Sequence, residues 1–418
     1  MRAMIMTAAC VAATSLGTAS AADLRMSWWG SEDRHIATQE ALTFCGDKFG
    51  HTITPEFTSW TGHQEKIATQ LAGRTEADIM QINWPWLPIF SKSGDGFADL
   101  NQFKDVIDLG QWSPADLNSG SVDGKLNGLP VSTTGRVFMF NKTTYDKAGL
   151  AIPTTWDDLF AAAPVMKEKL GQNYYPFEGT GLDARLVVIL RTTQKTGKDL
   201  IDPASEQVAW TTQELAEGLA FYQTMVDQGV VKSWENVAAE GNAPLHENPD
   251  WASGKIAGTY QWSSIYGKIV GPMEEDQHLV PVRLLQADGA TTEGIYRKPS
   301  MLFAISKHSK EPRAAAEIIN CLLNDPEAIR HLGATRGVPS SKVALEELTK
   351  AGSIEPVQIE VNGIVMESTG VGVSPLNEHP RVAEVFDSTF EAFAYGQISA
   401  ESAAAEIIDG INAILTGI

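Results

Sequence analysis

Cysteine is scarce in this chain of 418 residues, which contains only three. Three cysteines are too few for a disulfide-rich scaffold or for a metal site built from several thiolates. Cys10 lies in an N-terminal segment that we expect to be removed, which leaves Cys45 and Cys321. In an oxidising compartment these two could pair, and they could equally remain two separate buried thiols, so the sequence leaves both alternatives open.

Positive charge is also in short supply. The chain has 32 lysine and arginine residues against 52 aspartate and glutamate residues, which gives a formal net charge of −20. A chain this acidic repels nucleic acid and anionic membranes, so we expect neither of them as the main partner. The net charge still allows one small anion to be held by a local basic pocket.

The common motifs of catalysis and metal binding are missing as well. The sequence has no G-x-S-x-G nucleophile turn and no H-E-x-x-H zinc signature. Residues 120–125 look like a phosphate-binding loop, but the spacing of the glycines is wrong. The acidic clusters at 157–158 and 274–276 fit a helix start and a solvated loop, where carboxylates are common. We therefore expect no catalytic residue, no metal site and no cofactor.

Long apolar runs are absent apart from one near the N-terminus. Residues 3–16 are apolar or small, follow Arg2, and precede an A-x-A pattern at residues 19–21. This arrangement is typical of a signal peptide, so we predict that residues 1–21 are removed on export to the periplasm. The run is shorter than the roughly 20 residues that a membrane span needs. The remaining chain is too long for one hydrophobic core and fits two or three domains.

Strands and helices alternate in the first part of the mature chain. Strand-like segments at 24–29, 53–57 and 78–82 are separated by segments with helical spacing at 36–49 and 64–71. This β-α-β-α-β order predicts an α/β domain with a largely parallel sheet.

Tryptophan follows each of these three predicted strands, at the edge where ligands of such sheets bind. The five tryptophans concerned are Trp28, Trp29, Trp60, Trp84 and Trp86. Core burial is the usual fate of a tryptophan, but polar residues such as Asn83 lie among these five. We therefore interpret the loops as one edge of a binding site.

Several motifs, in order along the chain, resemble a known family. Residues 123–130 (DGKLNGLP) resemble the D-G-K-x-x-G-x-P turn of the family 1 extracellular solute-binding proteins. Further segments resemble that family at residues 140–142, 148–150, 153–159, 251–258, 262, 305–307 and 337–339. The stretches around Trp29, Trp60 and Trp84 also look like the oligogalacturonide-binding proteins of pectin-using bacteria.

The resemblance implies an α/β periplasmic binding protein fold of type II, like that of maltose-binding protein, with each lobe a sheet flanked by helices. We place the first lobe at residues 22–133 plus 299–344 and the second at 134–298 plus 345–418. The family closes its lobes on a solute and delivers it to the membrane permease of an ATP-driven ABC importer. The double crossing of the chain and the lack of an obvious interface predict a monomer.

A sugar ring offers an apolar face and a rim of hydroxyl groups, so its site needs flat aromatic side chains beside hydrogen-bonding groups. Trp262 follows the predicted strand at 256–260, where this family often has an aromatic residue, and it is the first candidate. Trp84, Trp29 and Trp60 are the next candidates for stacking, and Asn83 is a candidate for hydrogen bonding.

An acidic sugar also needs a positive partner for its carboxylate, and arginine suits it best because its fork binds both oxygens. Arg136 lies where the chain should first cross between the lobes, so we expect it to be partly enclosed and to be the main partner. Lys298, just before Pro299 at the return crossing, is the second candidate. Arg34 and His63 are expected at the rim of the site.

Two other functions remain open on the sequence alone. A secreted pectin-degrading enzyme would share export, tryptophan content and substrate, but it would need a calcium site or a catalytic base that we do not find. A binder of the same fold could instead hold a neutral maltose-like sugar or a small cation. Arg136 argues against the cation, because a cation site would need carboxylates in its place.

Overall fold

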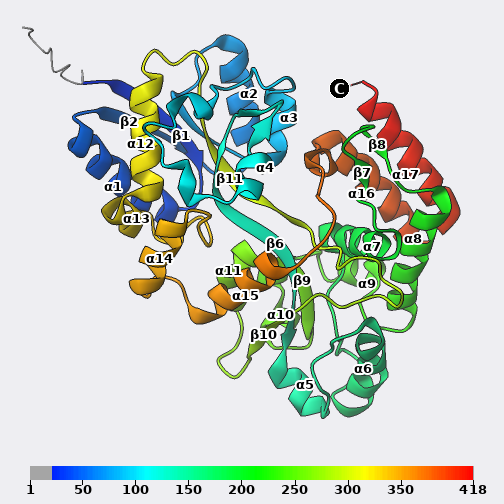
Figure 1. Cartoon of the computed structure of the whole chain (residues 1–418). Coiled ribbons are helices and arrows are strands. Elements are labelled where there is room, and N and C mark those ends of the chain that lie inside the picture. Colours follow the sequence, from blue (N-terminus) through cyan, green and yellow to red (C-terminus); the bar gives the residue numbers. More distant parts are fainter. Residues whose placement is uncertain (1–20, 418) are drawn as a thin grey trace, which may run out of the picture.

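The computed structural model describes residues 21–417, so all but the last residue of the predicted signal peptide lies outside the described residues. Two lobes lie side by side, one coloured mainly blue and yellow and the other mainly green and red in Figure 1. Two strands, β6 (Leu129–Asn141) and β11 (Arg297–Ile305), run between the lobes through the middle of the molecule. The expected two-lobed α/β fold is confirmed.

The first lobe begins with the predicted alternation of strands and helices. Its elements are β1 (Asp23–Trp29), α1 (Glu32–Phe49), β2 (Thr52–Thr58), α2 (His63–Gly73) and β3 (Ile79–Ile82). Both β2 and β3 pair with β1 in parallel, so the carboxyl ends of all three strands meet at one edge of the sheet.

One sheet continues from the first lobe into the second, with the strand order β10-β6-β11-β3-β1-β2 and with β9 also paired to β6. Residues 129–135 of β6 pair with β11. Residues 136–141 pair instead with β9 (Gly258–Trp262) and β10 (Leu279–Val282). Every residue of β6 is buried, because each half of the strand lies in the core of a different lobe.

Helices cover this sheet in both lobes. The remaining α-helices are α3 (Leu87–Phe90), α4 (Pro114–Ser119), α5 (Lys142–Ala148), α6 (Trp156–Lys169), α7 (Gly181–Thr196), α8 (Thr212–Asp227), α9 (Trp234–Ala239), α10 (Pro249–Ala252), α11 (Tyr266–Val270), α12 (Pro312–Asn324), α13 (Pro326–Leu332), α14 (Lys342–Lys350), α15 (Pro356–Glu367), α16 (Pro380–Ala394) and α17 (Ala400–Leu415). Within residues 21–417, none of the helices combines the length and apolarity needed to cross a bilayer.

Short elements complete the fold. The 3-10 helices are η1 (Trp84–Trp86), η2 (Leu100–Phe103), η3 (Leu109–Gln111), η4 (Leu245–Glu247), η5 (Ser263–Ile265) and η6 (Pro375–Glu378). Two hairpins pair β4 (Ser121–Val122) with β5 (Lys125–Leu126) and β7 (Ile201–Asp202) with β8 (Gln207–Val208).

Local sequence signals explain several of these boundaries. Thr155 and Asp158 form a capping box at the start of α6, and Asp325 accepts two backbone N–H groups at the start of α13. The β4–β5 turn has positive φ at both central residues, 49° at Asp123 and 76° at Gly124. A two-residue hairpin with this backbone favours an Asp-Gly pair, which accounts for the D-G of the motif in physical terms.

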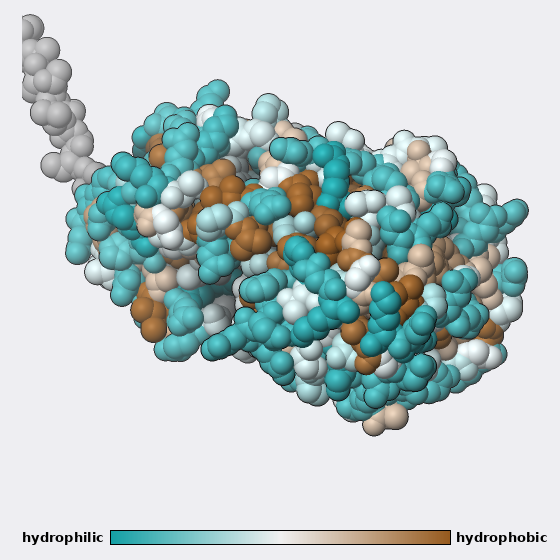
Figure 2. Space-filling view, turned by 90° about the horizontal axis from the view of Figure 1, so that it is seen from below, coloured by the Kyte–Doolittle hydropathy of each residue, from teal (hydrophilic) through white to brown (hydrophobic). Residues whose placement is uncertain are grey.

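Each lobe has its own apolar core, and each core is built from two separate stretches of the chain. Buried residues of 22–131 and 301–332 form one core, and those of 137–296 and 361–415 form the other. A small third cluster joins α13 and α14 through Ile329, Ala344, Leu348 and Ile354. On the face seen in Figure 2, apolar side chains gather in the middle of the molecule and polar ones dominate its two ends.

A disulfide joins the two stretches of the first core. Cys45 of α1 and Cys321 of α12 are bonded, with their Cα atoms 5.9 Å apart. Both side chains are buried. Of the two alternatives that the sequence left open, the structure selects pairing.

Candidate functional site

A cavity of about 810 Å³ lies between the two lobes. The first lobe contributes the loop after β3, helix α4 and the β4 strand, and the second contributes the β7–β8 turn. The crossing strand β11 forms part of its wall at residues 297–299. The rest comes from the strap, as we call residues 368–379 between α15 and α16. A cavity of this size suits a small ligand of one to a few sugar rings.

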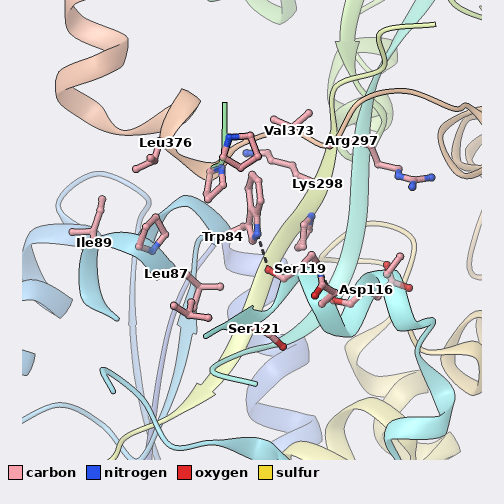
Figure 3. Close-up of a pocket in the computed structure, with 18 of the residues that line it drawn as sticks. Trp84, Leu87, Ile89, Asp116, Ser119, Ser121, Arg297, Lys298, Val373 and Leu376 are labelled. Atoms are coloured by element: carbon pink, nitrogen blue, oxygen red, sulfur yellow. Dashed lines mark hydrogen bonds between the residues drawn. The ribbon is translucent and has the colours of Figure 1, made fainter. Parts of the chain in front are cut away.

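Trp84 is the aromatic side chain of this cavity. It begins η1, and its indole Nε1 donates a hydrogen bond to the Ser119 carbonyl oxygen at 2.8 Å, drawn as a dashed line in Figure 3. This bond holds the ring upright between the strap and α4. Apolar side chains of both lobes lie around it in the cavity wall, namely Leu87, Ile89, Val373 and Leu376.

Short polar side chains form the side of the cavity next to α4. They are Asp116, Asn118, Ser119, Ser121 and Thr133. The Asp116 carboxylate already accepts hydrogen bonds from the hydroxyl groups of Ser113 at 2.6 Å and Thr133 at 3.2 Å. Fixed carboxylate, amide and hydroxyl groups of this kind match the hydroxyl rim of a sugar.

Lys298 is the cation that reaches over the cavity. Its side chain is 7% exposed, and its Nζ forms an ion pair with Glu378 of the strap. The same Nζ lies 4.8 Å from the centre of the Trp262 ring. Figure 3 shows Lys298 reaching over Trp84, whereas the neighbouring Arg297 points away. The Arg297 guanidinium donates to the carbonyl oxygen of Met366 at 3.2 Å, at the end of α15.

The strap is fastened to the second lobe by a buried carboxylate. Asp199 accepts the backbone N–H of Ser374 at 2.7 Å and the side-chain amide of Asn377 at 2.9 and 3.0 Å. Burial raises the pKa of Asp199 to about 6, although these hydrogen bonds favour the charged form.

Stability should therefore depend on the charge of Asp199. Its folded pKa of about 6 is above the ordinary 3.8, so the folded state binds the proton more tightly than the unfolded chain. The stabilisation is complete below about pH 4 and is lost as the pH rises to about 6, by up to about 3 kcal/mol. In urea unfolding across this range, Asp199→Asn should remove that part of the pH dependence. Exposed Asp409→Asn on α17 is the control, and parallel profiles for Asp199→Asn and wild type would contradict the prediction.

Of the residues predicted from sequence, the structure brings Trp84 and Lys298 to the cavity wall and places Trp262 against Lys298. Trp262 also meets Tyr296 edge to face, with ring centroids 5.6 Å apart. Asn83 directly precedes η1 and is half-buried beside Trp84, but it does not line the cavity.

Arg136 has a different environment from the one expected. It is fully buried in the second lobe rather than partly enclosed, because it lies opposite Trp262 in the β6–β9 pairing. Its Nη2 forms an ion pair with Asp183 and donates to the Tyr260 carbonyl oxygen, and its Nη1 donates to Gln261 at 3.3 Å. The protein itself therefore balances the charge of this guanidinium.

The other aromatic candidates form a cluster beside the cavity. Trp29 contacts Trp60, His63 and Trp86, with ring centroids 5.2 to 5.4 Å apart. Trp60 stacks on Trp86 and is 53% exposed, whereas Trp28 is fully buried in the core. His63 is buried and not at the rim; burial, with a contribution from Lys66, lowers its pKa to about 4, so it is neutral at pH 7.

Arg34 ties the first lobe together instead of standing free at a rim. Its Nε and Nη2 donate to the Thr335 carbonyl oxygen at 3.0 and 2.8 Å, and its Nη1 donates to that of Trp29 at 3.1 Å. Burial lowers its pKa to about 10, which still leaves it charged at neutral pH.

Sequence reasoning missed the strap and helix α4. The strap follows α15 as irregular chain with the glycines Gly370 and Gly372, which carry no pattern pointing to a ligand. The α4 side chains are small and polar, as in many surface turns. The sequence offered one signal for a site near these segments. Two cationic residues, Arg297 and Lys298, are adjacent at the return crossing between the lobes. Among residues 21–417, no three His, Cys, Asp or Glu side chains group as metal ligands would.

Two α/β lobes joined by crossing strands, with a cavity of apolar and polar side chains between them, define the class of two-lobed binding proteins. Residues 36–329 match the family described as bacterial extracellular solute-binding protein, and the chain belongs to this family.

Solved structures resemble the chain over almost its whole length. A periplasmic oligogalacturonide-binding protein of Yersinia enterocolitica, in complex with saturated digalacturonic acid, is 37% identical, with a TM-score of 0.86 over 95% of this chain and 99% of that one. A periplasmic solute-binding protein of Pectobacterium atrosepticum is 35% identical, with a TM-score of 0.88 over 95% of this chain and 99% of that one.

Curated relatives are more distant. The diacetylchitobiose-binding protein DasA of Streptomyces coelicolor is 26% identical over 308 residues, which cover 71% of this chain and 68% of that protein. A binding protein of Brucella abortus is 27% identical over 190 residues, and the match spans only 44% of the length of each.

Proposed function

We propose that this protein captures an acidic oligosaccharide, an oligogalacturonide or a related uronate, in the cavity between its lobes. The observation that carries the proposal is Lys298, a cation placed above an aromatic ring and beside a row of sugar-matching polar groups. The Yersinia protein with digalacturonic acid, at 37% identity, supports the same class of solute.

In this proposal Trp84 supplies a face for a sugar ring, Trp262 packs against Lys298, Lys298 pairs with a carboxylate, and the polar groups near Asp116 bind hydroxyls. The protein binds its solute without converting it. The two lobes, divided at residues 133/134 and 298/299 with a further return at 344/345, close on the sugar by bending at β6 and β11.

The proposal also covers transport. Export through the signal peptide at residues 1–21 places the protein in the periplasm, where it acts as a monomer. There it passes the sugar to the membrane permease of an ABC importer. The acidic surface repels an anionic sugar at long range, so affinity has to come from contacts inside the cavity, where salt screens less.

Calorimetric titration with digalacturonic acid and with galactobiose, its neutral counterpart, tests the proposal. The acid should bind at least about tenfold more tightly, because its carboxylate can form a charge-assisted contact with Lys298 that a neutral sugar cannot form. A preference for galactobiose would reject the acidic solute, while membership of the family would stand.

Trp84 should be the main aromatic anchor. Trp84→Ala is expected to weaken binding of digalacturonic acid by about 1–4 kcal/mol, as the loss of a buried aromatic contact usually does. Trp84→Phe is the matched control: it keeps a smaller aromatic face, loses the hydrogen bond to Ser119, and should bind less than about tenfold more weakly than wild type. Calorimetry on both folded variants measures the change in affinity. If Trp84→Ala binds digalacturonic acid as tightly as wild type does, Trp84 is not the main anchor and Trp262 is the next candidate.

A further inference from the structure

Lys298 lines the cavity and pairs with Glu378 of the strap. We propose that Glu378 holds the place of a ligand carboxylate on Lys298, so that an acidic sugar binds by exchanging its own carboxylate for that of Glu378. This inference rests on the proposed function, because it assumes an anionic solute in this cavity.

The surroundings of Lys298 favour the exchange of one carboxylate for another over the binding of a second carboxylate beside the first. One side of its ammonium group contacts the Glu378 carboxylate, and another faces the Trp262 ring at 4.8 Å. Its side chain is only 7% exposed. A second carboxylate brought to the same nitrogen would lie against the first in a poorly solvated place, where two like charges repel strongly. One of the two therefore has to leave.

Glu378 is only partly satisfied in its present position. Its Oε2 contacts Lys298, but its buried Oε1 lies beside the Tyr296 hydroxyl without a well-formed hydrogen bond. The Tyr296 hydroxyl beside it is buried as well. Leaving buried polar atoms unpaired costs free energy, so the Lys298–Glu378 pair is easier to replace than a fully bonded one.

The position of Glu378 couples this exchange to the strap. Glu378 ends η6, and η6 packs against η1, the short helix that carries Trp84. Five strap residues line the cavity, namely Gly372, Val373, Pro375, Leu376 and His379, and Glu378 lies between the last two. Release of Glu378 would remove one of the ties of the strap, while Asp199 still holds Ser374 and Asn377. Only a ligand that contacts Lys298 differently in the two arrangements can drive this change.

Neutral and acidic sugars meet this arrangement differently. A neutral sugar cannot replace the carboxylate on Lys298, so it meets a cavity whose cation is already paired. An acidic sugar supplies the new partner as it removes the old one. Displacing Glu378 offsets part of the free energy that the acid gains on Lys298, so Glu378 lowers the affinity for acidic sugars and leaves the affinity for neutral ones unchanged.

The test is Glu378→Gln, which keeps the shape of the side chain and removes its charge. Digalacturonic acid should bind this variant at least about tenfold more tightly than wild type, since no carboxylate competes for Lys298. Glu384→Gln on α16 changes the net charge equally at an exposed position away from the cavity and is the matched control. Its affinity for digalacturonic acid should stay within about threefold of wild type, as should the affinity of both variants for galactobiose.

The outcomes separate this inference from the proposed function. If wild type binds digalacturonic acid but Glu378→Gln binds it no more tightly than Glu384→Gln does, the exchange is rejected and the acidic solute stands. If neither wild type nor Glu378→Gln binds the acid, both ideas fail. A crystal structure of wild type with digalacturonic acid gives a readout that needs no variant. Exchange predicts the sugar carboxylate on Lys298 Nζ and Glu378 more than about 4 Å away, beyond ion-pair distance.

Discussion

Replacing Arg136 with methionine is expected to lower the free energy of unfolding by about 3–5 kcal/mol, because it breaks a buried ion pair and leaves Asp183 without its cation. The guanidinium is fully buried and also donates to the carbonyl oxygen of Tyr260. It lies over the rings of Tyr260 and Trp262, at 4.9 and 5.2 Å from their centres. Methionine keeps apolar contact with these rings. Most of the decrease in the free energy of unfolding should therefore come from the removal of the positive charge.

A second carboxylate makes the effect larger. Burial, helped by the neighbouring Asp183, raises the pKa of Glu178 well above its ordinary value. One guanidinium thus serves two carboxyl groups in the second lobe. Without it, Asp183 would keep the hydrogen bond from the Gln261 amide but would lie beside Glu178 without a cation, and would have to take up a proton or stay charged in a poorly solvated place.

Urea unfolding of Arg136→Met against wild type measures the loss. Arg313→Met is the control, because Arg313 pairs with Asp105 at a distance of 2.8 Å while both side chains are about three-fifths exposed. Such a surface pair contributes about 0–1 kcal/mol. If Arg136→Met is as stable as wild type but no longer binds digalacturonic acid, the stability prediction is wrong. Arg136 would then belong to the binding site, as the sequence alone suggests.

Arg136 also shows why the site is harder to predict than the fold. The strands and helices of the first lobe follow from hydrophobic period and capping, which are local signals, and they appear where the sequence predicts them. Whether a charged residue in a crossing strand faces a cleft or a core depends on its partner. Asp183 is 47 residues away on another element, and no local pattern in the sequence predicts that it pairs with Arg136.

The tryptophans also show that the sequence does not predict which side chains reach the binding site. Trp28 and Trp29 follow each other in β1, so their side chains point to opposite faces of the sheet. Trp28 is buried against Phe57 and His35, and Trp29 joins the cluster with Trp60. Period-2 alternation could have predicted this separation. It could not have predicted which face would meet the ligand, since the strap that covers the cavity arrives from the far end of the chain.

Removing the disulfide should destabilise the first lobe and leave the second almost unchanged. The bond closes a loop of 276 residues, which includes most of the second lobe, and holds α1 against α12. It keeps together two stretches of chain that would otherwise separate on unfolding. Cys45→Ala with Cys321→Ala is therefore expected to lower the stability of that lobe by about 2–5 kcal/mol.

Hydrogen exchange followed element by element is the sharpest measurement, because a two-lobed protein need not unfold in one step. Amides of α1 and α12 should exchange faster in the double variant, and those of α8 and α17 should not, since these two helices pack together in the other core. Wild type reduced under denaturing conditions and refolded with its thiols blocked is the control for loss of the sulfur atoms. Equal acceleration in both lobes would mean that they unfold as one unit, and unchanged protection of α1 would mean that packing alone holds the two stretches together.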